Sequence, residues 1–146
     1  MSWKSLLQAR RVSPHATSRR EIADLRAIVK RDLEDASVKG LSVDRRFAIA
    51  YEGGLQLGKM AVAAAGYRAT GPAHHQTTFE CLVLAIGPRA APLASYFEIC
   101  RRKRNQLEYD VAGVVSVTES AEVLRKVREL QATVEEWMAR NHPALA

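Results

Sequence analysis

Residues 42–66 read SVDRRFAIAYEGGLQLGKMAVAAAG, and small or apolar residues occur nearly all round the helix that this segment predicts. One stripe along that helix consists of Phe47, Tyr51, Gly54, Gly58, Ala61 and Ala65. An interior glycine costs a helix about 1 kcal/mol relative to alanine. The glycines therefore indicate that another helix backbone approaches closely here, and we expect this helix to be central in the fold.

Amphipathic patterns on both sides of the segment predict further helices. Ser18, followed three residues later by Glu21, forms a capping-box pattern, and apolar residues recur at helical spacing until Gly40. The segment from Tyr67 to His75 is expected to be the one long connection. The other expected helices are 3–11, a short one ending before Gly87, one over about 92–112, and one from near Thr118 to Asn141.

Length and composition indicate one helical domain. The chain has 146 residues, of which 47% are apolar, enough for a single core. Only 6% are aromatic and alanine is abundant, which favours close-packed helices over a sandwich of strands. We predict an all-α, up-and-down four-helix bundle over residues 18–142 with one or two additional short helices. Residues 1–17 are expected to be a short helix and linker, and 143–146 a tail.

Net charge, cysteine content and the N-terminal residues predict where in the cell the protein acts and what it can bind. The net charge of +6 admits an anionic partner without identifying one, because acidic and basic residues are interleaved. Cys81 and Cys100 lack metal-site spacing and are interpreted as reduced core thiols. The N-terminal residues lack the apolar run of a signal peptide, and no segment approaches the length of a membrane span. We therefore expect a cytoplasmic protein with no membrane partner.

The adjacent histidines His74 and His75 do not predict a metal site. Neighbouring residues point in different directions, and no third ligand follows at a helical spacing. We expect no metal and no cofactor. Capping or a core contact is the default interpretation of this pair, and a contact to an anion near a helix start is the alternative, with His75 as the candidate.

The segment 100–110, CRRKRNQLEYD, places an arginine on a packing face. The apolar stripe of its helix runs through Leu93, Phe97 and Cys100, and Arg104 occupies the next position. A guanidinium there must be paired, extend to solvent, or line a cleft or subunit boundary. Glu108, four residues later, is the expected intrahelical partner. Both a structural arginine at the core edge and a binding-site arginine remain open.

The pattern Arg104-Asn105-x-x-x-Tyr109 resembles the signature of the HEPN domain family, which is arginine, a polar residue, three variable residues and histidine. The preceding long helix with AYEGGLQLGKMAVAAAGYRA and the paired histidines resemble a bacterial branch of that family. The similarity spans about residues 18–140. It implies a four-helix bundle that dimerises and brings two copies of the motif into one cleft.

The resemblance also implies residue roles. Catalytic HEPN proteins are metal-independent ribonucleases, commonly toxins paired with a minimal nucleotidyltransferase antitoxin, whereas other members bind nucleotides or only protein partners. By this resemblance Arg104 would hold a phosphate and Asn105 would be its polar neighbour. Arg101, His75 and Tyr109 are further candidate contacts to RNA or a nucleotide, since a tyrosine can donate a hydrogen bond to phosphate or stack on a base. Tyr109 stands where the motif has histidine, and a tyrosine with a pKa near 10 is a poor base at neutral pH.

Three functions follow for the same chain. The leading hypothesis is a homodimer that binds RNA or a nucleotide in its interface cleft, within a toxin–antitoxin or defence system, with Arg104 and Tyr109 as the candidate catalytic residues and weak or absent nuclease activity. The second is a non-catalytic structural or interaction bundle. The third is an active metal-independent ribonuclease in which another acid or base replaces the histidine.

Overall fold

The computed structural model describes residues 1–108 and 113–146. It is all-α, as predicted, apart from two very short strands. The elements in chain order are α1 (Trp3–Gln8), β1 (Val12–Pro14), α2 (Arg19–Ala36), α3 (Val43–Ala64), β2 (Tyr67–Ala69), α4 (His74–Ile86), the 3-10 turn η1 (Pro88–Ala90), α5 (Ala91–Glu108) and α6 (Val117–Asn141).

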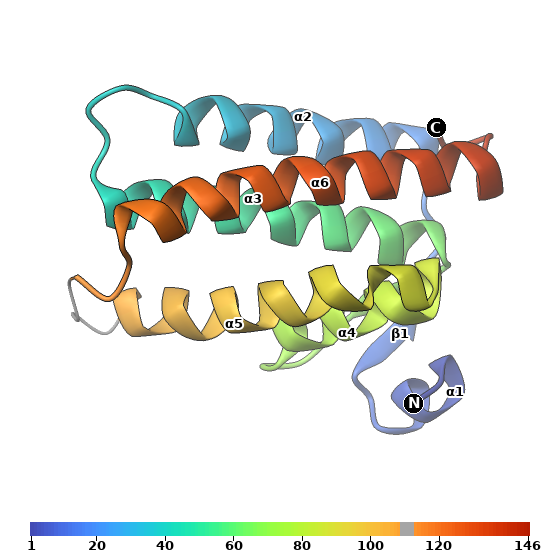
Figure 1. The fold of residues 1–146 in the computed structure, drawn as a ribbon. Coiled ribbons are helices and arrows are strands. Elements are labelled where there is room, and N and C mark those ends of the chain that lie inside the picture. The colour runs from blue at the N-terminus through green and yellow to red at the C-terminus, as the bar shows by residue number, and fades with distance from the viewer. Residues whose placement is uncertain (109–112) are drawn as a thin grey trace.

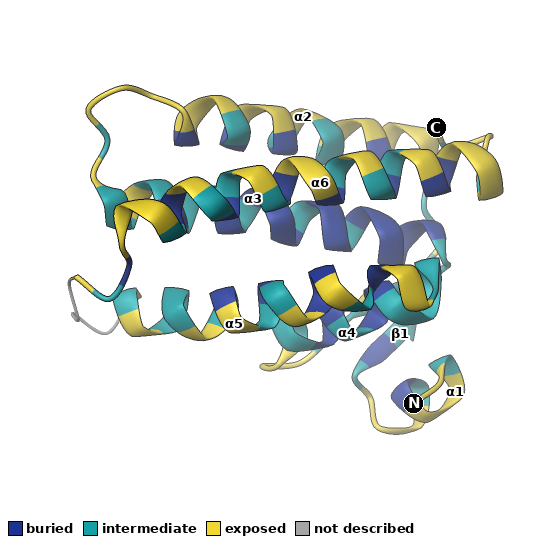
Figure 2. Ribbon diagram, in the orientation of Figure 1, coloured by how far each residue is buried: buried dark blue, intermediate teal, exposed yellow. Residues whose placement is uncertain are grey.

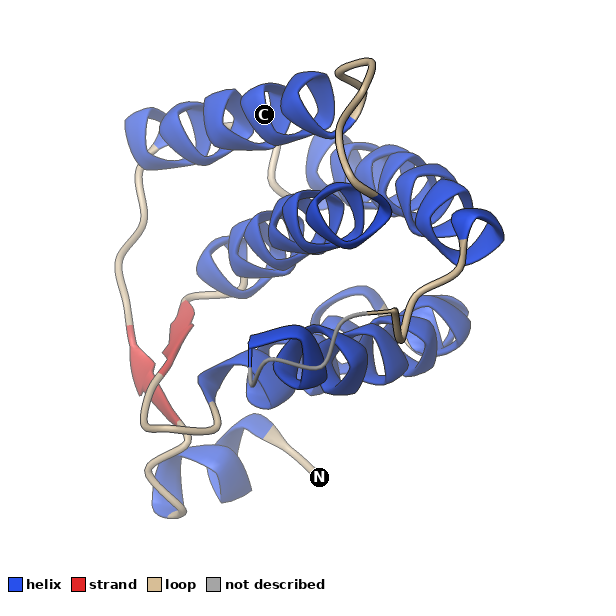
Figure 3. Cartoon of the chain, turned by 90° about the vertical axis from the view of Figure 1, so that its left-hand side faces the viewer, coloured by secondary structure: helices blue, strands red, loops and turns tan. Residues whose placement is uncertain are grey.

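The four long helices α2, α3, α5 and α6 alternate in direction along the chain (Figure 1). Helices α2 and α6 pack on one side of α3, and α4 and α5 pack on the other (Figures 1 and 3). In the part of the chain that the structure describes, no helix has the length and apolar content needed to cross a bilayer.

Helix α3 is the centre of the bundle, as its sequence predicts. Thirteen of its 22 residues are buried, and they lie on several of its faces. Figure 2 shows the contrast with α2 and α6, whose outer faces are exposed. Helix α2 instead buries a single stripe that includes Ile22, Val29 and Ala36. A helix that is apolar all round is stable in water only when neighbours cover it on all sides, and α3 meets that requirement.

The glycines of α3 leave space that side chains of α4 and α5 occupy. A Cβ atom at Gly54 would lie 2.6 Å from Cε1 of Phe97 in α5. A Cβ atom at Gly58 would lie 2.7 Å from Cγ2 of Thr78 in α4. Close approach was predicted at these positions, but the expectation that a helix backbone makes it was wrong. Side chains from α4 and α5 fill the space instead.

A two-stranded antiparallel sheet was not predicted. Strand β1 pairs with β2, with Val12 opposite Ala69. Figure 3 shows the pair beside α1. Strands of three residues are too short to display alternating hydrophobicity, and long-range contacts hold this pair in place. The Trp3 ring stacks on Tyr67 with centroids 4.2 Å apart, and Leu6 and Val12 share a small core with residues of α3 and α4.

The start of α2 follows its predicted capping chemistry in part. The Ser18 hydroxyl accepts a hydrogen bond from the backbone N–H of Glu21, as the capping-box pattern predicts. The Glu21 carboxylate does not return the bond, because it accepts hydrogen bonds from Thr17 and His15. The predicted long connection also ends earlier than expected, since His74 and His75 form the first turn of α4.

Substitution of the α3 glycines tests the packing. We expect Gly54→Ala to destabilise the fold by about 1–3 kcal/mol, because the new methyl group overlaps the Phe97 ring. Gly53→Ala is the matched control on the same helix. Its Cβ would meet Asp32 Cβ at 3.4 Å, an ordinary contact, so a neutral effect or a gain of up to about 1 kcal/mol is expected from helix propensity. Urea unfolding followed by circular dichroism measures both, and equal losses would contradict the packing.

Candidate functional site

Arg104 lies at the edge of the core and is paired on two sides. Its Nη1 is 2.7 Å from an oxygen of Glu108, which confirms the predicted intrahelical ion pair. Its Nη2 donates a hydrogen bond of 2.7 Å to Glu52 in α3, a partner that was not predicted. The guanidinium carbon is 6.0 Å from the centroid of the Tyr51 ring. With 22% of its side chain exposed, Arg104 is held in one orientation and still reaches solvent.

A hollow of about 410 Å³ opens beside this arginine between α4 and α5. Arg101, Arg104 and Asn105 line it from α5, and the first turn of α4 with His74 and His75 lines the other side. The structure therefore brings together four of the predicted site residues: Arg101, Arg104, Asn105 and His75. Tyr109, the remaining candidate, lies outside the described residues.

The first turn of α4 presents unpaired backbone donors to the hollow. Its N-cap residue, Ala73, has no side chain that can accept a hydrogen bond, and the first helical bond runs from Thr77 N–H to the Ala73 carbonyl. The N–H groups of His74, His75 and Gln76 meet no acceptor in the described part of the chain. Free N–H groups and the positive end of the helix dipole favour an anion at such a position.

His75 is half-buried and held by Tyr51. Its Nδ1 lies 3.3 Å from the Tyr51 hydroxyl. Burial, followed by the nearby charges of His74, Arg104 and Lys59, lowers the pKa of His75 to about 4. Burial raises the pKa of Tyr51 above its usual value, so the hydroxyl keeps its proton. At neutral pH His75 is an uncharged group that can accept from Tyr51 through Nδ1 and donate through Nε2.

Acidic residues compensate the basic run at positions 101–104. Arg101 makes two hydrogen bonds to Glu98, at 2.9 and 2.6 Å, which raise the pKa of Arg101 and lower that of Glu98. Arg102 lies 3.7 Å from the same carboxylate, and Lys103 pairs with Glu119 of α6. An anion at the hollow must therefore share these cations with carboxylates.

Candidate metal ligands and thiols were located in the described part of the chain. Within the described ranges, no three His, Cys, Asp or Glu side chains group as a metal site would require. Cys81 and Cys100 are free and buried, which agrees with their interpretation as core thiols. Burial raises the pKa of Cys81 to about 12 and that of Cys100 to about 11, so neither forms a reactive thiolate at neutral pH.

One signal in the sequence marks residues that the sequence analysis missed. Between Phe47 and Gly66 the only charged residues are Glu52 and Lys59. A charge on an otherwise apolar central helix must face a partner or an opening, because burial without either is costly. Glu52 faces Arg104. Lys59 lines a second hollow on the other side of His74.

A functional assignment for this chain is argued from its side chains, because comparison with known proteins found no match. The chain matches no protein-family model, no curated protein and no solved structure. The resemblance to HEPN proteins therefore depends on the motif residues quoted above.

The environment of His75 predicts a loss of stability in acid. The folded-state pKa near 4 lies below the unfolded value of about 6.5, so the unfolded chain binds more protons between these values. This contribution to stability is fully present above about pH 6.5 and is lost as the pH falls towards 4. Between pH 7 and pH 5 we expect His75 to account for about 1 kcal/mol after allowance for solvent screening.

Urea unfolding at pH 7 and pH 5 measures this contribution. His75→Gln keeps a hydrogen-bonding group beside Tyr51 and has no titratable ring, so the variant should lose about 1 kcal/mol less than the unsubstituted protein. NMR of the imidazole should show a titration midpoint near pH 4. A midpoint above pH 6 would contradict the assignment.

Proposed function

We propose that this chain is a HEPN-like protein that binds a phosphate group of RNA or a nucleotide in the hollow between α4 and α5. The observation that supports this most is geometric. The Arg104 guanidinium and the uncapped first turn of α4 line the same opening. A guanidinium and a set of backbone N–H groups are two donors that phosphate oxygens commonly accept from.

The pairing of Arg104 is compatible with binding. Each terminal nitrogen of a guanidinium carries two N–H groups, so Arg104 can donate to Glu52 and Glu108 and retain donors for a phosphate oxygen. The two carboxylates fix the plane of the group, which reduces the entropy lost on binding. The Asn105 side chain and the neutral His75 ring add donors without adding charge.

We propose further that two chains form the working unit. Ile99 on the outer face of α5 is 54% exposed. It lies beside a groove of about 520 Å³ between α4 and α5, which Phe79, Val83 and Ala94 also line. Pairing through this face would cover the apolar groove and bring two Arg104 sites near a shared interface, as the resemblance implies.

On the same resemblance, we propose a minimal nucleotidyltransferase antitoxin as the partner protein and a toxin–antitoxin or defence system as the context. Cleavage of RNA is expected to be weak or absent, because tyrosine replaces the motif histidine at position 109. A neighbouring gene for such a nucleotidyltransferase would support the partner assignment.

A purely structural role is the second candidate. Every basic residue at positions 101–104 has a carboxylate within ion-pair distance, and Arg104 has two. This compensation is what a bundle edge requires even without a ligand. The two candidates differ in what happens when the Arg104 charge is removed.

Substitution of Arg104 by methionine separates the two roles. For a phosphate-binding arginine we expect Arg104→Met to keep its melting temperature within a few degrees and to lose at least about tenfold in affinity for a short single-stranded RNA or a nucleotide. Arg104→Lys should retain part of the affinity, because it keeps the charge without the planar fork. Fluorescence anisotropy at low salt, beside a thermal melt, measures both properties.

Arg128→Met is the control, since it removes the same charge from an exposed position on α6 that lines neither the hollow nor the groove between α4 and α5. It should bind nearly as well as the unsubstituted protein. If the unsubstituted protein binds neither RNA nor nucleotide at low salt, or if binding in Arg104→Met only follows the folded fraction, Arg104 is structural.

Light scattering at micromolar concentration tests the dimer. We expect the mass of two chains, and Ile99→Glu should shift the protein to a monomer because it places a charge in the apolar interface. Val38→Glu is the control. Val38 is similarly exposed, at 53%, but lies between α2 and α3, away from the groove. A monomer in the unsubstituted protein would remove the two-copy site.

A further inference from the structure

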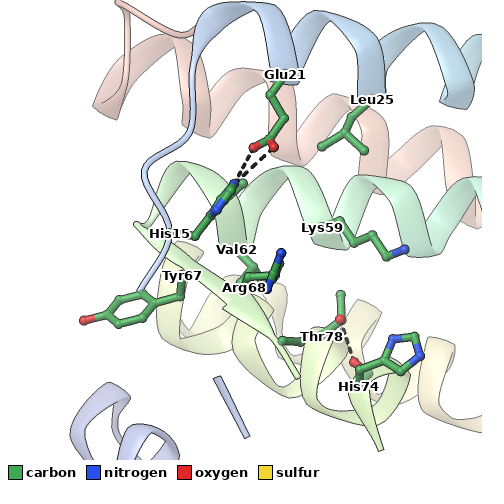
Figure 4. Close-up of a pocket in the computed structure, with 11 residues that line it drawn as sticks. His15, Glu21, Leu25, Lys59, Val62, Tyr67, Arg68, His74 and Thr78 are labelled. Atoms are coloured by element: carbon green, nitrogen blue, oxygen red, sulfur yellow. Dashed lines mark hydrogen bonds and ion pairs between the residues drawn. The ribbon is translucent and has the colours of Figure 1, made fainter. Parts of the chain in front are cut away.

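A second hollow lies between α2, α3, α4 and β2, and Figure 4 shows its lining. Its volume is about 240 Å³. The side chains of Leu25, Val62 and Ala63 form an apolar part of the wall. Arg101, Arg104 and Asn105 do not line it, so it is separate from the hollow between α4 and α5, although His74 borders both.

Three basic side chains around this opening have no carboxylate partner. Lys59, Arg68 and His74 form no ion pair within the described parts of the chain. Lys59 is half-buried and stands on the central helix, where an ammonium group loses part of its hydration. In Figure 4 these three side chains lie around the same space.

The acidic residue of the pocket is already engaged. Glu21 accepts a hydrogen bond of 2.6 Å from Thr17, and its two oxygens lie 2.8 and 3.1 Å from Nε2 of His15. The hydrogen bonds from Thr17 and His15 lower the pKa of Glu21, and the charge of Arg68 adds to this effect. The carboxylate forms no ion pair with Lys59 or Arg68. Glu21 is the one carboxylate among the described residues that line the pocket, against the two cations Lys59 and Arg68.

We propose that this pocket binds a small organic monocarboxylate. The carboxylate would accept hydrogen bonds from Lys59, Arg68 and His74, and a body of one ring or a short alkyl chain would contact Leu25, Val62 and Ala63. With the histidines counted as neutral, Lys59, Arg68 and Glu21 leave one net positive charge, which one carboxylate balances. A phosphate dianion would exceed that charge. The volume suits a ligand of about ten non-hydrogen atoms.

Titration with benzoate and hexanoate, followed by amide NMR, tests the proposal. At least one acid should cause saturable shifts at residues 59–69 and 74–78, with a dissociation constant in about the millimolar range for so small a ligand. Benzyl alcohol, which has the ring without the charge, should cause none of them. Absence of saturable shifts with both acids, or shifts confined to α5, would overturn the proposal.

Substitutions test which basic side chains bind the carboxylate. They also test whether this pocket is distinct from the proposed phosphate site. Lys59→Met and the exposed Arg68→Gln should each weaken binding about tenfold. Lys30→Met, at an exposed position on α2, is the control and should leave binding unchanged. Arg104→Met should also retain it, so loss of phosphate binding does not count against this pocket. Unchanged affinity in both Lys59→Met and Arg68→Gln would overturn the proposal.

Discussion

The close approach of α4 and α5 to α3 at Gly54 and Gly58 is the constraint on which the rest of the structure depends. The Phe97 ring and the Thr78 methyl group occupy the space that larger residues on α3 would fill. With these contacts in place, Phe79 and Phe97 stack at 5.4 Å between ring centroids, and the two helices share one core with α3. Two interior glycines lower the stability of helix α3, and the close packing that they permit offsets this loss.

This packing determines where the polar side chains meet. Because α5 lies close to α3, the Arg104 guanidinium reaches Glu52 on the neighbouring helix. Because α4 lies close to the same helix, the His75 ring reaches the Tyr51 hydroxyl. Neighbouring residues of α3, Tyr51 and Glu52, thus orient one side chain from each adjacent helix. The hollow between α4 and α5 is polar because side chains such as His75, Arg101 and Asn105 line it.

The first turn of α4 links the two hollows. It lacks a side-chain cap, and His74 borders both openings. The N-terminal segment also contacts α4, because the Arg11 guanidinium donates hydrogen bonds to the side chains of Thr77 and Glu80. The N-terminal residues, which the sequence suggests are a separate helix and linker, thereby support the helix that forms one wall of each hollow.

Local patterns in the sequence were sufficient to predict that the main helices form. Apolar residues at helical spacing predicted α2, α3 and α6 and the central place of α3, and four-residue spacing predicted the Arg104–Glu108 pair. The motif resemblance placed Arg101, Arg104 and Asn105 in one candidate site, and these residues lie within two turns of α5. Such features depend on neighbours in the chain, so a single sequence displays them.

Tertiary structure alone decided which helices face one another. Three features join segments that are far apart in the chain: the pairing of β1 with β2, the Arg104–Glu52 contact and the His75–Tyr51 contact. None has a local pattern, and the two side-chain contacts depend on how closely α4 and α5 pack against α3. The physical reason is packing, because the space left by two glycines sets the distance between helices, and that distance determines which polar groups come within hydrogen-bonding reach.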